Sequence, residues 1–409
     1  MRILILAHFY PPEMGGAAAR LSGTAKWLHR FGHEVTVVTG VPNYPQGKIY
    51  PTFTNRFLQF ERIDNVDIIR TWSLCSTKKS SLLRILNYLN FMVMSVIAGI
   101  ICKGKFDIII ASSPPLFVGI SGWTLAKIFH IPWIFDIRDL WPDIAVETGE
   151  FKSNSLIVKL SRIIADHIHI SANHLTPVTE SKKEKLVLQG IQTHKITVVH
   201  NGIDIDIINL EQHTTPLDEL KQQGKIILIY AGLIGIAQGL DIIIEAAKKL
   251  QDENNIHFVI IGDGFHKKHL IKLTESYNLA NISFLPSISR TMIPSYLKKA
   301  DTALIPLANA NIADAIPSKL MEAWGCELPV ILIAGGEARK LVEESGGGIT
   351  ISPGDVEMLS NAILELSVNK RLRTEYGQKG YKFIVESYTR DRLTARMNEV
   401  INTVVKVIQ

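Results

Sequence analysis

The sequence predicts an α/β protein of two doubly wound domains, each a parallel sheet between layers of helices. Short apolar, β-branched runs alternate with helical stretches along nearly the whole chain, a rhythm typical of parallel sheets covered on both faces. The rhythm is interrupted once, by a polar stretch that contains Pro216. The boundary between the domains is therefore expected near residues 202–225.

Strands are expected at five runs in each half of the chain. In the first half they are Arg2–Tyr10, Glu34–Thr39, Asp67–Trp72, Phe106–Ala111 and Pro132–Ile137. In the second half they are Lys225–Tyr230, His257–Ile261, Ile282–Leu285, Thr302–Pro306 and Val330–Ile333. Ala17–Phe31 has helical spacing, so the first strand, this helix and the second strand predict a right-handed crossover. From Asp355 onward the chain reads as mostly helical.

Composition narrows the class of protein. With 409 residues, 46% of them hydrophobic, the chain can build large cores, which excludes intrinsic disorder. The net charge of +5 is too small and too dispersed to indicate nucleic-acid binding, but it suits an anionic membrane surface or a phosphorylated substrate. Cys75, Cys102 and Cys326 lie far apart, which favours a reducing cytosol and neither a zinc site nor a disulfide framework.

One apolar segment departs from the alternating pattern. Residues 85–102 contain no charged side chain, and as a helix they would extend about 27 Å. Three interpretations stay open: a buried crossover helix, a helix lying in a membrane interface, and a membrane span, which would disrupt the sheet. Basic residues that could dock on lipid flank the segment on both sides: Lys78, Lys79, Arg84, Lys103 and Lys105.

Two polar motifs fall where the first domain should bind ligands. Gly15 and Gly16 stand between the first strand and first helix, where doubly wound sheets place an anion-binding loop. Arg138 and Asp139 follow the strand that ends at Ile137, at the expected crevice, and could contact sugar hydroxyls and a developing charge. The alternatives are a tight turn without ligand and a local Asp–Arg ion pair that fixes the loop.

A third motif, Pro317–Glu322, follows the predicted strand Thr302–Pro306. Ser318 is expected to cap a helix, which puts Lys319 in the first turn, where a cation opposes the helix dipole. An anionic ligand would resolve this conflict, and Glu322 could then accept hydroxyl groups of a ribose. The alternative is a solvated surface lysine. Asp204 follows a turn signal, so we expect it to cap a helix rather than to bind a metal.

In this order and spacing, the motifs resemble family 4 retaining glycosyltransferases of the GT-B fold, and among them the WbuB-like branch. The resemblance runs along most of the chain. Besides the motifs above, it includes Val178–Ser181, Val199–Asp204, Tyr230–Gly232, Gln238–Asp241 and Ile261–Gly264.

The resemblance implies an acceptor-binding domain over residues 1–205, a nucleotide-sugar-binding domain over 206–385, and a helix over 386–409 that crosses back to the first domain. It places Gly15, Gly16 and Gly232 at the donor, the first two beside its diphosphate. It makes Glu322 the second glutamate of the family's E-x7-E motif. Asp139, with Arg138, corresponds to the polar region beside the transferred sugar.

The chain departs from the family pattern at two points. Asp314 replaces the first glutamate of E-x7-E and is one methylene shorter. The cations that usually clamp the diphosphate align near Leu233 and Gln238, neither of which is charged. Lys319 is expected to supply that charge.

The expected activity is retaining transfer from a UDP-sugar, such as UDP-N-acetyl-L-fucosamine, to an undecaprenyl-diphosphate-linked saccharide. The expected process is O-antigen, lipopolysaccharide or capsule assembly at the cytoplasmic face of the bacterial plasma membrane. The resemblance implies no cofactor, no metal and no nucleic-acid partner. A non-hydrolysing UDP-sugar epimerase and a catalytically silent nucleotide-sugar-binding membrane scaffold remain as alternatives.

Overall fold

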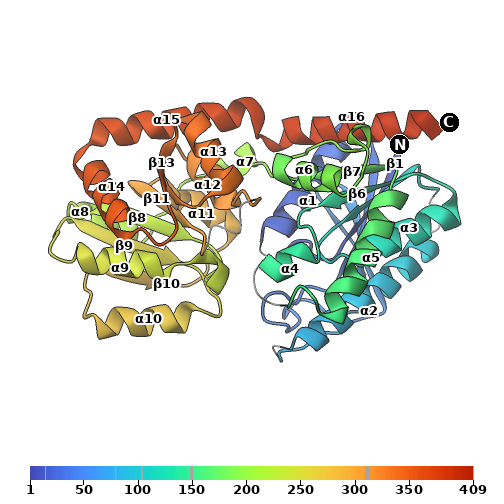
Figure 1. Cartoon of the computed structure of the whole chain (residues 1–409), viewed down its shortest axis with the longest axis horizontal. Coiled ribbons are helices and arrows are strands. Elements are labelled where there is room, and N and C mark those ends of the chain that lie inside the picture. The colour runs from blue at the N-terminus through green and yellow to red at the C-terminus, as the bar shows by residue number, and fades with distance from the viewer. Residues whose placement is uncertain (14, 79, 103–104, 148–150, 309–313, 409) are drawn as a thin grey trace. The chain divides into compact units, whose positions relative to one another are not determined.

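The chain folds into two compact units, described here by a computed structural model that covers all residues except 14, 79, 103–104, 148–150, 309–313 and 409 (Figure 1). The first unit comprises Met1–Asn201 and Arg390–Gln409, and the second comprises Gly202–Thr389. Each is an open sheet with helices on both faces, so the predicted α/β class with two doubly wound sheets is confirmed.

The first unit contains a seven-stranded sheet in the order β3-β4-β2-β1-β5-β6-β7. All neighbouring pairs are parallel except β3 and β4. The strands are β1 (Arg2–Ala7), β2 (Glu34–Gly40), β3 (Leu58–Ile63), β4 (Val66–Thr71), β5 (Ile108–Ser112), β6 (Trp133–Ile137) and β7 (His174–Pro177). The helices are α1 (Gly16–Arg30), α2 (Ser81–Ile101), α3 (Val118–Phe129), α4 (Asp143–Glu147), α5 (Leu156–Ser171), α6 (Glu180–Leu188) and α16 (Arg390–Ile408).

Strand residues of the first unit point alternately into two cores, one on each face of the sheet. Leu4 and Leu6 pack with residues of α2, α3 and α5. Ile3 and Ile5 pack on the other face with α1 and the last helix, α16. This alternation explains why the parallel strands are apolar on both sides. It also keeps the carboxyl ends of β1 and β6 at the same edge, with β5 between them.

The second unit contains a six-stranded parallel sheet in the order β10-β9-β8-β11-β12-β13. The strands are β8 (Ile226–Ala231), β9 (Ile256–Ile261), β10 (Ile282–Leu285), β11 (Thr302–Pro306), β12 (Val330–Ile333) and β13 (Gly348–Ile351). The helices are α7 (Ile205–Ile208), α8 (Leu217–Gln222), α9 (Asp241–Lys249), α10 (Lys267–Ser276), α11 (Ile293–Leu297), α12 (Ser318–Gly325), α13 (Gly336–Ser345), α14 (Val356–Val368) and α15 (Lys370–Ser387). Two cores again cover the two faces of this sheet.

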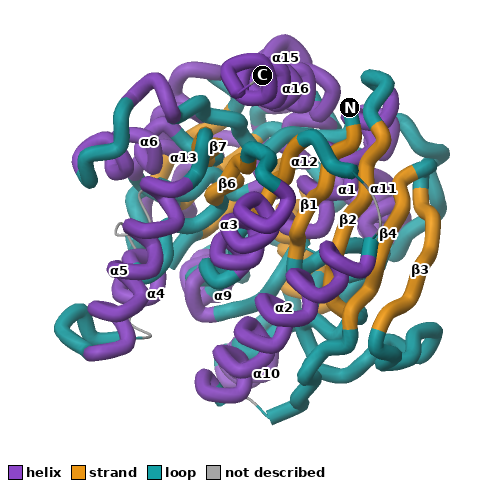
Figure 2. Tube along the Cα trace, turned by 90° about the vertical axis from the view of Figure 1, so that its right-hand side faces the viewer, coloured by secondary structure: helices purple, strands orange, loops and turns teal. Residues whose placement is uncertain are grey.

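Helix α2 contains the apolar segment 85–102 and packs against the sheet and α3 (Figure 2). Phe91 and Ala98 on its inner side are fully buried. Its outer side exposes Leu82, Val93 and Ile100, and only 28% of its most apolar window is buried. The segment is therefore a crossover helix that is buried on its inner side only, and its insertion in a membrane interface stays a prediction. Among the described residues, Leu82–Ile101 is the one helix long and apolar enough to cross a membrane, by length and composition.

Candidate functional site

Helix α12 positions the Pro317–Glu322 motif at the carboxyl end of the second unit's sheet, after β11. Pro317 occupies the N-cap position with φ −62° and ψ 130°, and Ser318 is already the first helical residue. The prediction that Ser318 caps the helix is therefore wrong. Pro317 has the φ its ring imposes, and a proline side chain cannot accept a hydrogen bond from the first turn. The N–H of Leu320 in that turn donates to the carbonyl of Pro317 (3.1 Å), whereas, among the described residues, the N–H groups of Ser318 and Lys319 are left for another acceptor.

Lys319 lies in the first turn of α12, which contains no acidic residue. Its Nζ is 5.2 Å from the ring centroid of Tyr230, and its side chain crosses the backbone at Gly232. Gly232 has φ +149°, and a Cβ there would overlap Cε of Lys319. Both features require glycine at this position, so Gly232 allows the lysine to lie over the end of β8.

Glu322 lies one turn after Lys319 in a group of four charged residues. The pKa of Glu322 lies above its ordinary value, mainly because the carboxyl group is buried. The positive charges of Arg290 and Lys319 oppose this rise, and the negative charge of Asp204 adds to it. Asp204 stands at the N-cap of α7, as predicted, but its carboxylate forms an ion pair with Arg290 (3.0 Å) and no side-chain capping bond is found for it. The prediction that its side chain caps the helix is therefore wrong. Sequence reasoning missed Arg290 because nothing in its spacing links it to Asp204, 86 residues away.

The environment of Lys319 disfavours its own charge. Burial lowers the pKa of Lys319, and the negative charge of Glu322 offsets this only in part. The N-terminus of α12 adds a positive dipole to the same place. An anion bound there would neutralise the ammonium and accept bonds from the free N–H groups. This geometry can bind a phosphate or diphosphate.

The pocket beneath Lys319 and Glu322 is too small for a nucleotide-sugar. Its free volume is about 10 Å³, about enough for one water molecule, whereas ligand pockets commonly enclose about 300–1,000 Å³. Its other walls are largely apolar residues of β8, β11 and α11, among them Ile229, Ala231 and Leu297. A nucleotide-sugar on this unit would therefore lie over the outer side of the first turn of α12.

The first unit carries a different charged arrangement at the ends of its strands. Asp136, the penultimate residue of β6, is fully buried and pairs with Arg20 of α1 at 2.8 Å. It also accepts hydrogen bonds from Ser112 (2.7 Å) and Thr176 (3.1 Å). Although burial raises the pKa of Asp136, these partners hold it below its usual value.

An Asp–Arg pair therefore does fix this region, but the arginine is Arg20, 116 residues away, and not Arg138. The pair ties β6 to α1. Gly15 is the N-cap of that helix with φ +140°, and Gly16 is its first residue. The structure thus connects, through Arg20, the two motifs that sequence reasoning found separately.

Arg138 keeps an unsatisfied donor. Its backbone N–H donates to Oγ of Ser113 (3.3 Å), whereas its buried Nε has no hydrogen-bond partner among the described residues. Burial lowers the pKa of Arg138, and the neighbouring Asp139 raises it. A ligand oxygen would satisfy this donor.

Glu13 stabilises the loop that leads to Gly15 and Gly16. Its carboxylate accepts hydrogen bonds from the backbone N–H groups of Asn43 (2.9 Å), Tyr44 (2.9 Å) and Tyr10 (3.4 Å). Burial nevertheless raises the pKa of Glu13. This residue joins the loops after β1 and β2, and sequence reasoning missed it because its partners are backbone groups, which leave no sequence signal.

The remaining predicted residues are placed as follows. Lys78, Arg84 and Lys105 are exposed at the two ends of α2, whereas Lys79 and Lys103 lie outside the described residues. Asp314 is buried, directly after the undescribed residues 309–313. Its contact with the sugar stays a prediction, as does that of Gly15 and Gly16 with the diphosphate.

Two family models match the chain, one for each unit. The model described as "Glycosyl transferase 4-like domain" matches residues 15–202, and "Glycosyl transferases group 1" matches residues 212–383. The chain is also similar to WcaI of Escherichia coli K12, whose name assigns it to colanic acid biosynthesis as a glycosyl transferase. The two are 27% identical over 398 residues, covering 93% of this chain and 96% of WcaI.

Solved structures share the fold at low sequence identity. Sucrose-phosphate synthase of Thermosynechococcus elongatus superposes with a TM-score of 0.79 at 16% identity, covering 99% of both chains. HepE of Anabaena, solved in complex with UDP and glucose, superposes with a TM-score of 0.72 at 17% identity, covering 98% of this chain and all of that chain. At these identities the similarity establishes the two-domain GT-B architecture alone.

Proposed function

The chain belongs to the glycosyltransferases of the GT-B fold, and we propose that it transfers a sugar, with retention, from a UDP-sugar to a lipid-linked saccharide. The proposal that the enzyme uses a nucleotide-sugar donor rests on the placement of Lys319. It is a partly desolvated cation at a helix N-terminus, fitted against Gly232, with Glu322 one turn further on. An anionic ligand would stabilise this cation.

In the proposed reaction, the bond between the anomeric carbon and the β-phosphate oxygen breaks. The acceptor hydroxyl oxygen bonds to the same face of the sugar, and its proton passes to the departing phosphate oxygen. Negative charge therefore grows on the diphosphate. Lys319 and the N–H groups of the first turn of α12 are placed to stabilise that charge, so this scheme uses no metal ion. Glu322 accepts hydrogen bonds from the ribose hydroxyls.

The first unit supplies the polar groups for the sugar and the acceptor. We assign Asp139 to positioning of the transferred sugar and Arg138 to a ligand oxygen, in agreement with the unsatisfied Nε of Arg138. An Asp139→Asn variant should lose kcat and keep its KM for the donor within about threefold, because the interaction matters most as the sugar gains positive charge.

A lipid-linked acceptor is supported by the outer surface of α2 and α5. Helix α5 exposes Leu156, Leu160, Ile163 and Ile170, which recur at i, i+4, i+7 and i+14 and so form one stripe. Helix α3 packs against both helices. Together with the exposed outer side of α2, they form an apolar surface on the first unit.

The charge around this surface favours a membrane as its partner. Lys78 and Arg84 at one end of α2, and Lys105 at the other, are exposed. Basic groups beside an apolar surface suit the anionic cytoplasmic leaflet. We therefore propose that the enzyme is peripheral at the cytoplasmic face of the plasma membrane, where undecaprenyl-diphosphate saccharides are accessible.

The finer identity of the substrates rests on the resemblance. It favours an L-fucosamine-type donor such as UDP-N-acetyl-L-fucosamine and a product that enters O-antigen or capsule. The name of WcaI supports a role in polysaccharide assembly, and the complex of HepE with UDP and glucose supports a uridine donor. In this proposal, Lys319 on α12 binds the diphosphate and Glu322 binds the ribose.

The test is UDP release from a panel of UDP-sugars with a synthetic lipid-diphosphate-saccharide acceptor. The enzymes compared are wild type, Lys319→Ala and Glu322→Ala. Lys272→Ala is the matched control, because Lys272 is exposed on α10 of the same unit. We expect acceptor-dependent release that collapses in the two site variants and is retained in the control.

Other outcomes would identify the alternatives. Inversion of the donor sugar without any acceptor would indicate an epimerase. Donor binding without turnover of any panel member would indicate a silent scaffold. Acceptor-dependent release that is indifferent to Lys319→Ala would show that the diphosphate lies elsewhere.

A further inference from the structure

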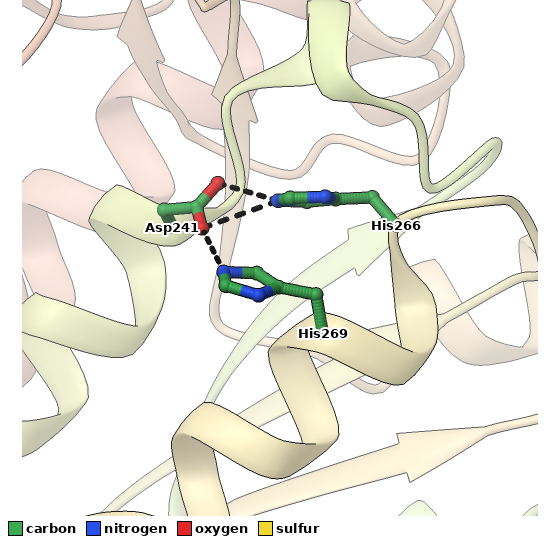
Figure 3. A group of neighbouring side chains, drawn as sticks. All are labelled: Asp241, His266 and His269. Atoms are coloured by element: carbon green, nitrogen blue, oxygen red, sulfur yellow. Dashed lines mark hydrogen bonds and ion pairs between the residues drawn. The ribbon is translucent and has the colours of Figure 1, made fainter.

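Three side chains outside the donor residues converge in the second unit (Figure 3). Asp241 is the first residue of α9, His266 is the N-cap residue of α10, and His269 lies in the first turn of α10. Nε2 of His266 is 2.9 Å from Oδ2 of Asp241, and Nε2 of His269 is 3.1 Å from Oδ1. The three ligand atoms all lie within 4.8 Å of one another.

The cluster is held in place by the fold. The backbone N–H of His266 donates to the carbonyl of Ile234 (3.0 Å), and its side chain is only 16% exposed. Its ring stacks on that of His269 with centroids 4.6 Å apart and an angle of 30°. Both imidazoles therefore direct Nε2 at one carboxylate before any ligand arrives, which is the preorganisation that metal sites need.

We propose that Asp241, His266 and His269 form a binding site for a zinc-type divalent cation. Two imidazole nitrogens and one carboxylate oxygen are a donor set that suits Zn²⁺, with water in the fourth position. With metal–ligand bonds of about 2.0–2.1 Å, a tetrahedral ion separates its ligand atoms by about 3.3–3.5 Å. From Oδ1 of Asp241, the distances of 3.2 Å to Nε2 of His266 and 3.1 Å to Nε2 of His269 are a few tenths of an ångström shorter than that separation, and the two nitrogens lie within 4.8 Å of each other. Mg²⁺ and Ca²⁺ are disfavoured because they prefer oxygen ligands.

The competing explanation is a hydrogen-bonded brace in which each histidine donates its Nε2–H to Asp241. This accounts for the separations of 2.9 and 3.1 Å equally well. The two explanations differ in the protonation states that they require of these three side chains. A brace needs only an oxygen acceptor at residue 241, whereas a metal site needs the ionised carboxylate and both unprotonated nitrogens.

A bound ion would stiffen two loops at the carboxyl edge of the sheet. The N–H of Ile234 donates to the carbonyl of Asp263 (2.9 Å), so the loop after β8 and the loop after β9 are already paired. The ion would close the other end of this pairing by joining Asp241 to His266. Slower amide exchange over residues 232–241 and 262–266 on adding Zn²⁺ is the expected sign.

The experiment uses the full-length enzyme without an affinity tag, with Zn²⁺ and Co²⁺ as probes. We expect one tightly held Zn²⁺ per chain, the intense visible bands of tetrahedral Co²⁺, and a rise in melting temperature of about 5 °C or more at hundredfold excess over Kd. His269→Ala should abolish all three, and since His269 is 57% exposed, this variant should fold. His213→Ala is the matched control, because His213 is an exposed histidine of the same unit that forms hydrogen bonds through its backbone N–H and C=O groups.

A second variant separates the two explanations. Asp241→Asn keeps an oxygen acceptor for the histidines and removes the negative charge. A metal site should lose at least tenfold in Zn²⁺ affinity in this variant. Absence of tight Zn²⁺ binding in the wild type, or binding that is equal in wild type and His269→Ala, would overturn the proposal and leave a brace.

Discussion

Both units place charged side chains at the carboxyl ends of their sheets, yet the surroundings of those charges differ between the units. In the first unit, Asp136 is surrounded by Arg20, Ser112 and Thr176 at hydrogen-bonding distance. In the second, Lys319 and Glu322 have pKa values that burial shifts against their charges. The first arrangement is complete within the protein. We propose that a ligand completes the second.

This difference has a physical reason. Removing a charge from water costs several kcal/mol, and a close partner with further hydrogen bonds offsets that cost. Asp136 has these partners, so its role is to join β6 to α1. Lys319 faces a helix dipole of the same sign, so we expect its location to weaken the folded enzyme and, in the proposed function, to favour an anionic ligand. Such local conflicts are typical of functional sites.

The largest effect is expected when the buried carboxylate of Asp136 is removed. Asp136→Ala should lower the free energy of unfolding of the first unit by about 3–5 kcal/mol, because it leaves Arg20 buried without its counter-charge. Urea denaturation followed by tryptophan fluorescence measures the change. Asp139→Ala is the matched control, because Asp139 follows the same strand, and it should cost less than about 1 kcal/mol. Equal losses in the two variants would contradict the assignment of Asp136 as the structural charge.

The second prediction is that removing the buried charge of Lys319, in the second unit, does not reduce stability. Lys319→Met should leave the melting temperature unchanged or raise it, because it removes a desolvated charge and keeps the packing over Gly232. The same change should lower kcat/KM for the donor by about 100- to 1,000-fold, as loss of one charge-stabilising group does. A variant that loses stability and retains turnover would reverse the roles we give to the two units.

Sequence reasoning predicted the fold well because the signals for it are local. Runs such as Ile282–Leu285, Thr302–Pro306 and Val330–Ile333 match strands β10, β11 and β12 residue for residue. It missed β3, β7 and β13. Strand β7 contains His174 and Thr176 and ends in Pro177, so it lacks the continuous apolar run that indicates the other short strands. Strand β3 is an antiparallel edge strand, and its alternating pattern and the Asp64–Asn65 turn with positive φ were the available signals.

The site was predictable only where its residues are neighbours in the sequence. The Pro317–Glu322 motif contains both Lys319 and Glu322, so one helix turn indicates their chemistry. Arg20 and Arg290 act on partners 116 and 86 residues away, and no spacing rule connects them. The cluster of Asp241 with His266 and His269 was missed for the same reason, since only the fold brings α9 beside α10.

A third prediction concerns pH and sharpens the contrast between the units. Burial lowers the pKa of Lys319, so the lysine loses its charge at a lower pH than the ordinary value of about 10.4, and donor affinity should fall with rising pH. Burial raises the pKa of Glu322, so this group protonates above its ordinary value of about 4.3, and affinity should also fall with decreasing pH. Titration calorimetry with a UDP-sugar, whose diphosphate diester does not titrate in this range, should give a bell-shaped profile.

Two conservative variants assign the two sides of this profile. Lys319→Arg should remove the alkaline fall, because arginine stays charged, and Glu322→Gln should remove the acid fall at the cost of about tenfold weaker binding. A profile that is unchanged in both variants would mean that other groups control donor binding.

The smallest expected effect concerns the apolar surface on α2 and α5. Ile163 is 66% exposed, and burying part of its side chain in the lipid interface is worth about 1 kcal/mol. Ile163→Ser should therefore reduce partitioning onto anionic vesicles about three- to fivefold in a sedimentation assay. Val368→Ser, which removes an equally apolar and 82% exposed side chain from the second unit, should have no effect.

The electrostatic and apolar contributions to membrane binding can be measured separately. High salt, or replacement of Lys78, Lys79, Lys103 and Lys105 by Gln, should release much of the protein from washed membranes, because surface charges are screened within about 10 Å. Retention unchanged by both treatments would reject electrostatic docking. Since none of these side chains lies in the second unit, donor binding should persist in every such variant, and a loss of donor binding would show that the two units do not act independently.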